Sequence, residues 1–313
     1  MPELPEVEVV RAGIEPAVTG ARVAGVEVFD PRSLRRHDPS NGSFTALLEG
    51  RRMLGAVRRG KFLWVPLEGG RALVAHLGMS GQLLLRSPGH TGDRLLRIRL
   101  HLDHPDGSEY WLNFVDQRIF GSMAVDALLP TPDGFPGGFS GTARGTSGDT
   151  DAWATLPSQV AHIARDPIDP AFRDDHFLTA LSAKRTGVKR AILDQTLISG
   201  IGNIYADEAL FTAQIHYAQP ASSLSRTTAR SLLAAVRTIL HKALAEGGTS
   251  FDAQYVNVNG ESGYFAHSLL AYGQHGKPCP RCGTILVREA FMNRSSHLCP
   301  RCQTVRTRPH PAD

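Results

Sequence analysis

The sequence predicts an α+β protein, in which an N-terminal antiparallel β-sandwich headed by one helix is followed by a helical domain and a small cysteine-bearing β-hairpin. Two observations lead to this fold class: the changing spacing of apolar residues along the chain and the clustering of its cysteines. Apolar residues keep a helical spacing in the first stretch of the chain, then alternate with polar neighbours, and return to helical spacing from Asp174 onward. The four cysteines all lie between residues 279 and 302.

The N-terminal half begins with a helix and continues as strands. Val7, Val10 and Ile14 share one helical face, and Gly20 is the predicted end of the helix, because glycine readily adopts the left-handed conformation found there. Alternation of apolar and polar residues then predicts half-buried strands between turns, which together form a sandwich. The clearest strands are predicted at 62–65, 73–75, 97–102 and 109–115.

The C-terminal half is predicted to be helical up to its last segment. Helices at 175–183, 187–198 and 203–213 precede a longer one that ends at Gly247 and Gly248. The apolar face of this longer helix consists of Ala229, Leu232, Leu233, Val236, Ile239, Leu240, Ala243 and Leu244.

A segment without periodicity separates the two halves. Residues 129–158 are rich in Pro, Gly, Ser and Thr, which predicts a linker insertion to which we attach no function. The predicted domains are therefore a β-sandwich at 1–128, the linker, a helical domain at 159–265, a cysteine hairpin at 266–306 and a tail at 307–313.

Composition limits the class of protein. The chain has 313 residues, 42% hydrophobic and 20% charged, and a formal net charge of +4, which is compatible with a polyanionic partner. No run approaches the ~18 apolar residues of a membrane span, and the N-terminus does not have the pattern of a signal peptide. Cysteines confined to one cluster argue against a disulfide-stapled secreted fold. We expect a cytoplasmic protein.

The cysteines form two pairs with metal-ligand spacing. Cys279 and Cys282 bracket two residues, as do Cys299 and Cys302. Each such turn points two thiolates at one centre, and four thiolates complete the tetrahedral shell that zinc prefers. A closed shell leaves no open position, so the sequence predicts one structural zinc that holds a β-hairpin too small to have a core of its own.

The first six residues carry a possible nucleophile. Removal of Met1 would leave Pro2 as a secondary amine, and an α-amino group has a pKa of roughly 8, against about 10.4 for lysine. A neutral amine can attack an electrophilic carbon and form a Schiff base. Glu3 can act as general acid or base, and Glu6 follows one helical turn later. The alternative is an ordinary capped helix start, in which the acidic residues are stabilised by the positive end of the helix dipole.

A glycine-bearing turn opens one of the predicted helices. Residues 200–206 match the dinucleotide fingerprint GxGxxG/A, but that interpretation requires a preceding strand, and here both flanks are helical. We favour a turn between two helices in which Asn203 caps the second and faces a phosphate. Upstream cations either follow a phosphate backbone or form a solvated helix face; they are Lys184, Arg185, Lys189 and Arg190.

Five motifs in this order resemble the formamidopyrimidine-DNA glycosylase family of helix–two-turn–helix repair enzymes. They are MPELPEVE at the N-terminus, HLGMSG at 76–81, DQRIFG at 116–121, GIGNIYADEALF at 200–211 and the closing CPRC pair. The resemblance extends to about residue 304 and fails only in the insertion. Gln117 and Ile119 depart from the usual motif without removing its named contacts.

The resemblance implies a bifunctional glycosylase and AP lyase acting on duplex DNA that contains 8-oxoguanine or a formamidopyrimidine opposite cytosine. Pro2 would attack the sugar C1′, with Glu3 assisting, and β,δ-elimination would cut the strand on both sides. Lys61 and Arg294 would hold the phosphates, and Glu6 would order the site, which we expect in a cleft between the two domains. Without the resemblance, Lys61 and Arg294 are ordinary solvated side chains.

The resemblance also implies contacts to the DNA. Met79 would fill the gap left by an everted base, Arg118 would pair with the orphaned cytosine, and Phe120 would wedge the next base step. From the residues alone, Met79 and Phe120 are more typical of a core. The remaining predicted DNA contacts are His76, His90, Lys184 and Asn203.

Two rival functions and one segment stay open at this point. An endonuclease VIII-type enzyme would prefer oxidised pyrimidines, although PELPE, Met79, Arg118 and Phe120 favour the purine enzyme. A protein that recognises lesions without catalysis is the second rival if Met1 is retained. Residues 248–265 either close over the everted base or link to the zinc hairpin. We expect a nucleoid-associated monomer, because reading one lesion needs no two-fold symmetry.

Overall fold

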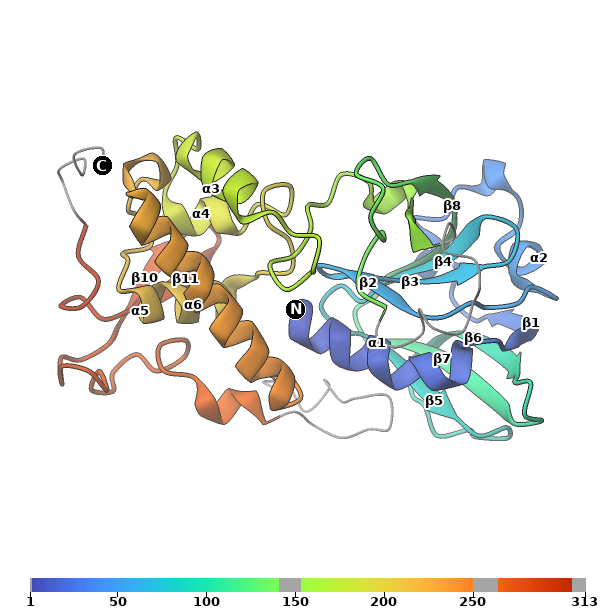
Figure 1. Cartoon of the computed structure of the whole chain (residues 1–313). Coiled ribbons are helices and arrows are strands. Elements are labelled where there is room, and N and C mark those ends of the chain that lie inside the picture. The colour runs from blue at the N-terminus through green and yellow to red at the C-terminus, as the bar shows by residue number, and fades with distance from the viewer. Residues whose placement is uncertain (1, 141–152, 250–263, 306–313) are drawn as a thin grey trace. The chain divides into compact units, whose positions relative to one another are not determined.

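The computed structural model describes residues 2–140, 153–249 and 264–305. The chain divides into two compact units (Figure 1). The first consists of Met1–His162 together with Gly247–Gly263, and the second of Ile163–Glu246 together with Tyr264–Asp313. Residues 247–249, which follow the longest helix, thus belong to the N-terminal unit, although they are far from it in sequence.

Helix α1 (Leu4–Val18) starts the first unit as predicted. Its start is fixed by a capping box, in which the Glu3 side chain accepts from the Glu6 backbone and the Glu6 side chain accepts from the Glu3 backbone. Pro5 occupies the first turn, where its missing N–H costs nothing. The apolar face of α1 is buried against strands β2, β3 and β5.

Two antiparallel sheets form the sandwich. One has the order β1 (Arg22–Val28), β6 (Leu96–Asp103), β7 (Glu109–Asp116) and β5 (Gly81–Arg86). The other has the order β2 (Val57–Arg59), β3 (Phe62–Leu67), β4 (Arg71–His76), β8 (Ser122–Pro130) and β9 (Thr155–Pro157). Side chains from both sheets, from α1 and from α2 (Phe44–Leu48) share one core, in which Phe114 and Ile98 are fully buried. This confirms the predicted sandwich headed by a helix.

Both ends of the predicted linker are part of the sheet. Strand β8 runs on to Pro130, and Leu128–Pro130 pair with the three residues of β9. Phe139 bridges to Arg58 at the other edge of this sheet. Pairings this short have no detectable period in the sequence, so the prediction of a linker was wrong at these ends. Residues 141–152 lie outside the described part of the chain.

The second unit contains α3 (Asp174–Ser182), α4 (Val188–Ile192), α5 (Asn203–Ala213) and α6 (Arg226–Ala245). Helix α4 is shorter than the predicted 187–198, because the Gln195 side chain donates to the Leu193 and Ile201 carbonyls and accepts from Gly200 N–H, which stabilises a turn instead. Helix α6 buries the predicted apolar face. The hairpin β10 (Val287–Phe291) and β11 (Arg294–Leu298) completes this unit.

Two connecting loops of the sandwich pack directly on each other. Residues 76–81 join β4 to β5, and residues 116–121 join β7 to β8. Gly78 has φ +63°, and a Cβ atom there would lie 2.3 Å from the backbone C and O of Phe120. Only glycine fits this approach, so the two loops act as one packed layer that bears Met79, Arg118 and Phe120.

This contact predicts a site-specific loss of stability. We expect Gly78→Ala to lower the free energy of unfolding by about 3 kcal/mol, because a left-handed residue with a side chain costs roughly 1–2 kcal/mol and the clash adds to it. Gly89 has φ +84° with nothing within 4 Å, so Gly89→Ala should lose only about 1 kcal/mol. Urea unfolding compares the two variants, and equal losses would contradict the packed-loop interpretation.

Candidate active site and nucleic-acid interface

The N-terminal end of the chain is buried and held by one carboxylate. Pro2 and Glu3 are buried, and Glu3 is 3% exposed. One oxygen of Glu6 accepts the Glu3 backbone N–H at 2.9 Å. The other accepts both the backbone N–H and the hydroxyl of Thr249, at 2.7 and 2.8 Å. Glu6 therefore fixes the backbone next to Pro2, which agrees with an ordering role.

Gly248 makes this contact possible. Its φ is +81°, and a Cβ atom would lie 3.1 Å from a Glu6 carboxylate oxygen. The sequence predicted this glycine as a helix end and as the start of the segment 248–265, but nothing in the pattern predicted that Thr249 contacts Glu6. A contact between residues 6 and 249 is invisible to periodicity. The rest of the segment predicted to close over the base, 250–263, lies outside the described residues.

Lys61 occupies the two-residue turn between β2 and β3, where Arg59 pairs with Phe62. This hairpin is fastened to α1 through Arg58, whose side chain is fully buried and donates to Glu8 at 2.8 Å. Glu8 also accepts from Arg11 at 2.8 Å. The ion pairs hold the strand turn that carries Lys61 on the helix that begins next to Pro2.

His76 ends strand β4 with its ring against Phe62, 4.9 Å between centroids. Burial, followed by the positive charges of Arg36, Arg35 and Lys61, lowers the pKa of His76 to about 4. Its buried Nδ1 has no hydrogen-bond partner among the residues that the structure describes. The ring is therefore neutral at pH 7 and can offer a hydrogen bond but no charge.

The loop of residues 116–121 presents its side chains outward. Phe120 is 45% exposed, and Arg118 is exposed next to it, so Phe120 is not a core residue. The loop backbone is fixed by the Asp116 carboxylate, which accepts from the N–H groups of Arg118 and Gly121 at 3.1 and 2.6 Å. Met79 lies on the facing loop and is partly buried. These three predicted contacts share one layer.

His90 has different neighbours. Its ring lies 3.4 Å from the Asp93 carboxylate, which also pairs with Arg86 at 2.9 Å. The His90 carbonyl accepts from Arg99 at 3.5 Å. These contacts place His90 in a separate polar cluster at the β5–β6 connection.

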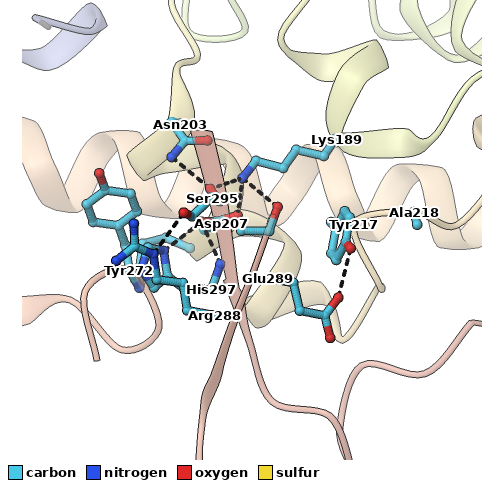
Figure 2. A network of polar contacts seen from close by, with 12 residues as sticks. Lys189, Asn203, Asp207, Tyr217, Ala218, Tyr272, Arg288, Glu289, Ser295 and His297 are labelled. Carbon is cyan, nitrogen blue, oxygen red and sulfur yellow. Dashed lines mark hydrogen bonds and ion pairs between the residues drawn. The ribbon is translucent and has the colours of Figure 1, made fainter. Parts of the chain in front are cut away.

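In the second unit, Lys189 corrects one prediction. The sequence allowed it to follow a phosphate backbone or to be solvated, yet its side chain is 0% exposed and pairs with buried Asp207 at 2.7 Å (Figure 2). It also donates to the Ser295 carbonyl at 3.1 Å and to the Ser296 hydroxyl at 2.8 Å. Both predictions were wrong for Lys189, because its partners lie far away in sequence, on the next helix and on the hairpin.

Asn203 is not the helix cap. Gly202 occupies the cap position, and the Asn203 amide donates to the Ser295 carbonyl at 3.1 Å. Asn203 is only 8% exposed, and its Oδ1 has no partner within the described ranges. Lys184 pairs with Asp194 at 2.7 Å and is partly exposed. Asn203 and Lys189 therefore both hold strand β11, which starts at Arg294.

The network centred on Asp207 positions the hairpin. Asp207 also accepts the His297 backbone N–H at 2.9 Å, and Tyr217 donates to Glu289 of the facing strand at 2.7 Å (Figure 2). Arg294 is exposed at the tip of this hairpin, where it pairs with Phe291 across the turn. Buried charges on the helices thus support an exposed cation on the hairpin.

The cysteine cluster fits a zinc ion. The sulfur atoms of Cys279, Cys282, Cys299 and Cys302 all lie within 4.8 Å of one another. Cys279 and Cys299 are buried in a small core with Phe211, Ala271 and Leu286. Four thiolates converging on one point form a closed tetrahedral donor set, so these residues would hold one structural zinc. This confirms the predicted cofactor.

Helices α4 and α5 are joined by a turn that contains glycine and support a four-cysteine hairpin, and this arrangement defines a helix–two-turn–helix protein with a zinc finger. No helix in the described part of the chain is long and apolar enough to cross a membrane.

Comparisons with known proteins agree with this class. Residues 1–123 match the formamidopyrimidine-DNA glycosylase N-terminal domain, 163–254 its H2TH domain, and 276–305 the zinc finger found in FPG and IleRS. Formamidopyrimidine-DNA glycosylase of Leifsonia xyli is 64% identical over 97% of this chain and 99% of its own length. That of Thermobifida fusca is 55% identical, with 97% of each chain covered.

Solved structures show the same fold. The MutM (FPG) protein of Thermus thermophilus aligns with a TM-score of 0.74 and 36% identity, over 96% of this chain and 98% of that chain. A Lactococcus lactis FPG mutant in complex with Fapy-dG containing DNA aligns with a TM-score of 0.77 and 25% identity, over 96% and 99%. The chain belongs to the formamidopyrimidine-DNA glycosylase family, which confirms the resemblance and the fold class.

The depressed pKa of His76 predicts a pH-dependent stability. The unfolded ring, with a pKa near its ordinary value of 6.5, binds protons more tightly than the folded ring at about 4, so stability is complete above 6.5 and falls as the pH drops towards 4. Between pH 7.5 and pH 5 we expect the wild type to lose up to about 2 kcal/mol more free energy of unfolding than His76→Gln. Urea unfolding at both pH values measures this; parallel losses would contradict a buried neutral ring.

Proposed function

We propose that this protein removes oxidised purines, 8-oxoguanine and formamidopyrimidines, from duplex DNA and then cleaves the strand at the resulting abasic site. The observation that carries the proposal is the buried Pro2-Glu3 end, held by Glu6 at the start of α1. The family supports the substrate class, because related structures hold Fapy-dG containing DNA, abasic-site DNA and carbocyclic 8-oxo-G DNA. High identity to formamidopyrimidine-DNA glycosylases favours this over an oxidised-pyrimidine enzyme.

Catalysis starts at the N-terminal nitrogen. After removal of Met1, Pro2 is a secondary amine whose pKa of roughly 8 leaves part of it neutral near pH 7. Its lone pair attacks the sugar C1′, and the base leaves with the electron pair of the glycosidic bond and a proton. The Pro2 nitrogen then loses its proton, and the C1′–O4′ bond breaks with protonation of O4′, which opens the sugar ring and gives the Schiff base. Glu3, buried at 3% exposure, supplies a proton at the sugar or base.

Strand cleavage follows from the Schiff base. The iminium withdraws electrons from the sugar, so the neighbouring C2′–H loses its proton and the 3′ phosphate leaves by β-elimination. A second elimination expels the 5′ phosphate, and water then releases Pro2 from the sugar remnant. The two eliminations each couple loss of a proton to loss of a phosphate, and the last step is hydrolysis of the iminium, so no redox partner is needed.

Cationic and polar side chains would hold the phosphates. Lys61 at the β2–β3 turn and Arg294 at the hairpin tip would bind the phosphates that leave. A guanidinium can bind a phosphate in bidentate fashion. His76 offers a neutral N–H. Lys184 would give up its ion pair with Asp194 and pair with a phosphate of the DNA backbone. Asn203 and His90 are further proposed contacts to the DNA.

The packed loops would replace the everted base. Exposed Phe120 can wedge a base step, Met79 can fill the vacated space, and Arg118 can donate two hydrogen bonds to the orphaned cytosine.

We further propose that the protein acts as a monomer on the nucleoid in the bacterial cytoplasm.

The proposal predicts a covalent intermediate at the N-terminus. Borohydride reduces a Schiff base to a stable amine, so the mature protein should form an adduct with an 8-oxoguanine:C duplex. Pro2→Gly and a form that retains Met1 should lose most of this adduct while still binding the duplex. Gel mobility of the denatured protein–DNA product measures it.

The outcomes separate the proposed activities. An adduct confined to the mature protein supports the lyase through Pro2. Binding without an adduct in any form would leave a lesion-binding protein and would overturn the proposal.

A further inference from the structure

Arg35 is a residue outside the proposed machinery that contacts part of it. It directly follows the short helix Pro31–Leu34. Its guanidinium donates to the carbonyls of Ile119 and Gly121, both at 2.7 Å, and to the carbonyl of Phe120 between them. One planar group thus holds three consecutive carbonyls of the loop that carries Arg118 and Phe120.

The opposite side of the loop is held by a buried acid. Asp116 is 0% exposed and accepts from the N–H groups of Arg118, Ile119 and Gly121. Ser80 from the facing loop donates to the same carboxylate at 2.6 Å. The N–H groups therefore point to Asp116 and the carbonyls to Arg35, and together these two residues form a clamp around the loop.

The clamp holds a strained backbone. Ile119 adopts φ +55°, a left-handed conformation that a β-branched residue rarely occupies. Such a residue persists only where the surroundings over-determine its conformation. The contacts from Arg35 and Asp116 supply that constraint, because they satisfy the peptide groups on both sides of Ile119.

We propose that Arg35 is a positioning residue that sets the selectivity for the base opposite the lesion. The inference rests on the function proposed above, in which Arg118 reads the orphaned cytosine. A bidentate readout discriminates only if its donors are held in one geometry before the DNA arrives. While Arg35 holds the loop, the donors of Arg118 keep the geometry that pairs with cytosine. When the loop carbonyls bond to water instead, the Arg118 side chain can also move to pair with adenine.

A different role for Arg35 makes a different prediction. Arg35 is exposed, so its charge could instead contact a phosphate. Lysine keeps that charge but, as a compact ammonium group, cannot reproduce the planar fork that spans three carbonyls. Arg35→Lys therefore separates a clamp from a phosphate contact.

The test measures kcat/KM on duplexes with 8-oxoguanine opposite cytosine and opposite adenine. We expect Arg35→Lys to reduce the cytosine-over-adenine ratio of the wild type about tenfold. Arg52→Lys is the matched control, because Arg52 is 55% exposed and pairs loosely with Glu68 at 3.7 Å on another part of the unit. Its ratio should equal that of the wild type.

Other results would overturn the inference. An unchanged ratio, or an equal loss on both duplexes with a changed salt dependence, would make Arg35 a phosphate contact or a bystander. If thermal melting shows that Arg35→Lys is poorly folded, Ser80→Ala removes a contact of the clamp from the other side and should lower the ratio; an unchanged ratio there contradicts the clamp. A wild type that does not excise 8-oxoguanine would instead refute the proposed function.

Discussion

The Glu6 carboxylate is the constraint on which the candidate active site depends. It accepts hydrogen bonds from Glu3 near one end of the chain and from Thr249 beyond the longest helix. Chain termini are usually poorly ordered, whereas a nucleophile at the N-terminus must be held in one position relative to its substrate. A buried carboxylate whose two oxygens both accept hydrogen bonds fixes the backbone next to Pro2, the residue proposed as the nucleophile.

The same principle recurs around Lys61 and Arg294, the residues proposed to bind phosphates. In each case a buried ion pair holds the element that carries an exposed cation. Lys189 and Asp207 hold the strand that begins at Arg294, and Glu8 and Arg58 hold the turn that carries Lys61. The count of 34 lysines and arginines therefore overstates the number of cations available to phosphates, because the cations in such pairs are already neutralised. The paired cations stabilise the fold, and only the exposed cations remain to bind phosphates, at the positions where the fold holds them.

The sequence predicted the elements and the local motifs but not the contacts between distant residues. Helix α1, the strands and the zinc cysteines follow from periodicity and spacing, which are local signals. The buried state of Lys189, the cap at Gly202 instead of Asn203, and the pairing of β9 each depend on a partner elsewhere in the chain. Thr249 and Arg35 have no motif that would reveal them.

The location of the covalent bond tests the account most directly. Borohydride-reduced adduct from an abasic duplex can be digested and its modified peptide sequenced by mass spectrometry. The account predicts that the sugar remnant lies on the nitrogen of Pro2 in a peptide that begins with that residue. A remnant on the amine of Lys61, or on any other lysine, would contradict the central claim that the fold holds the chain's own N-terminus as the nucleophile.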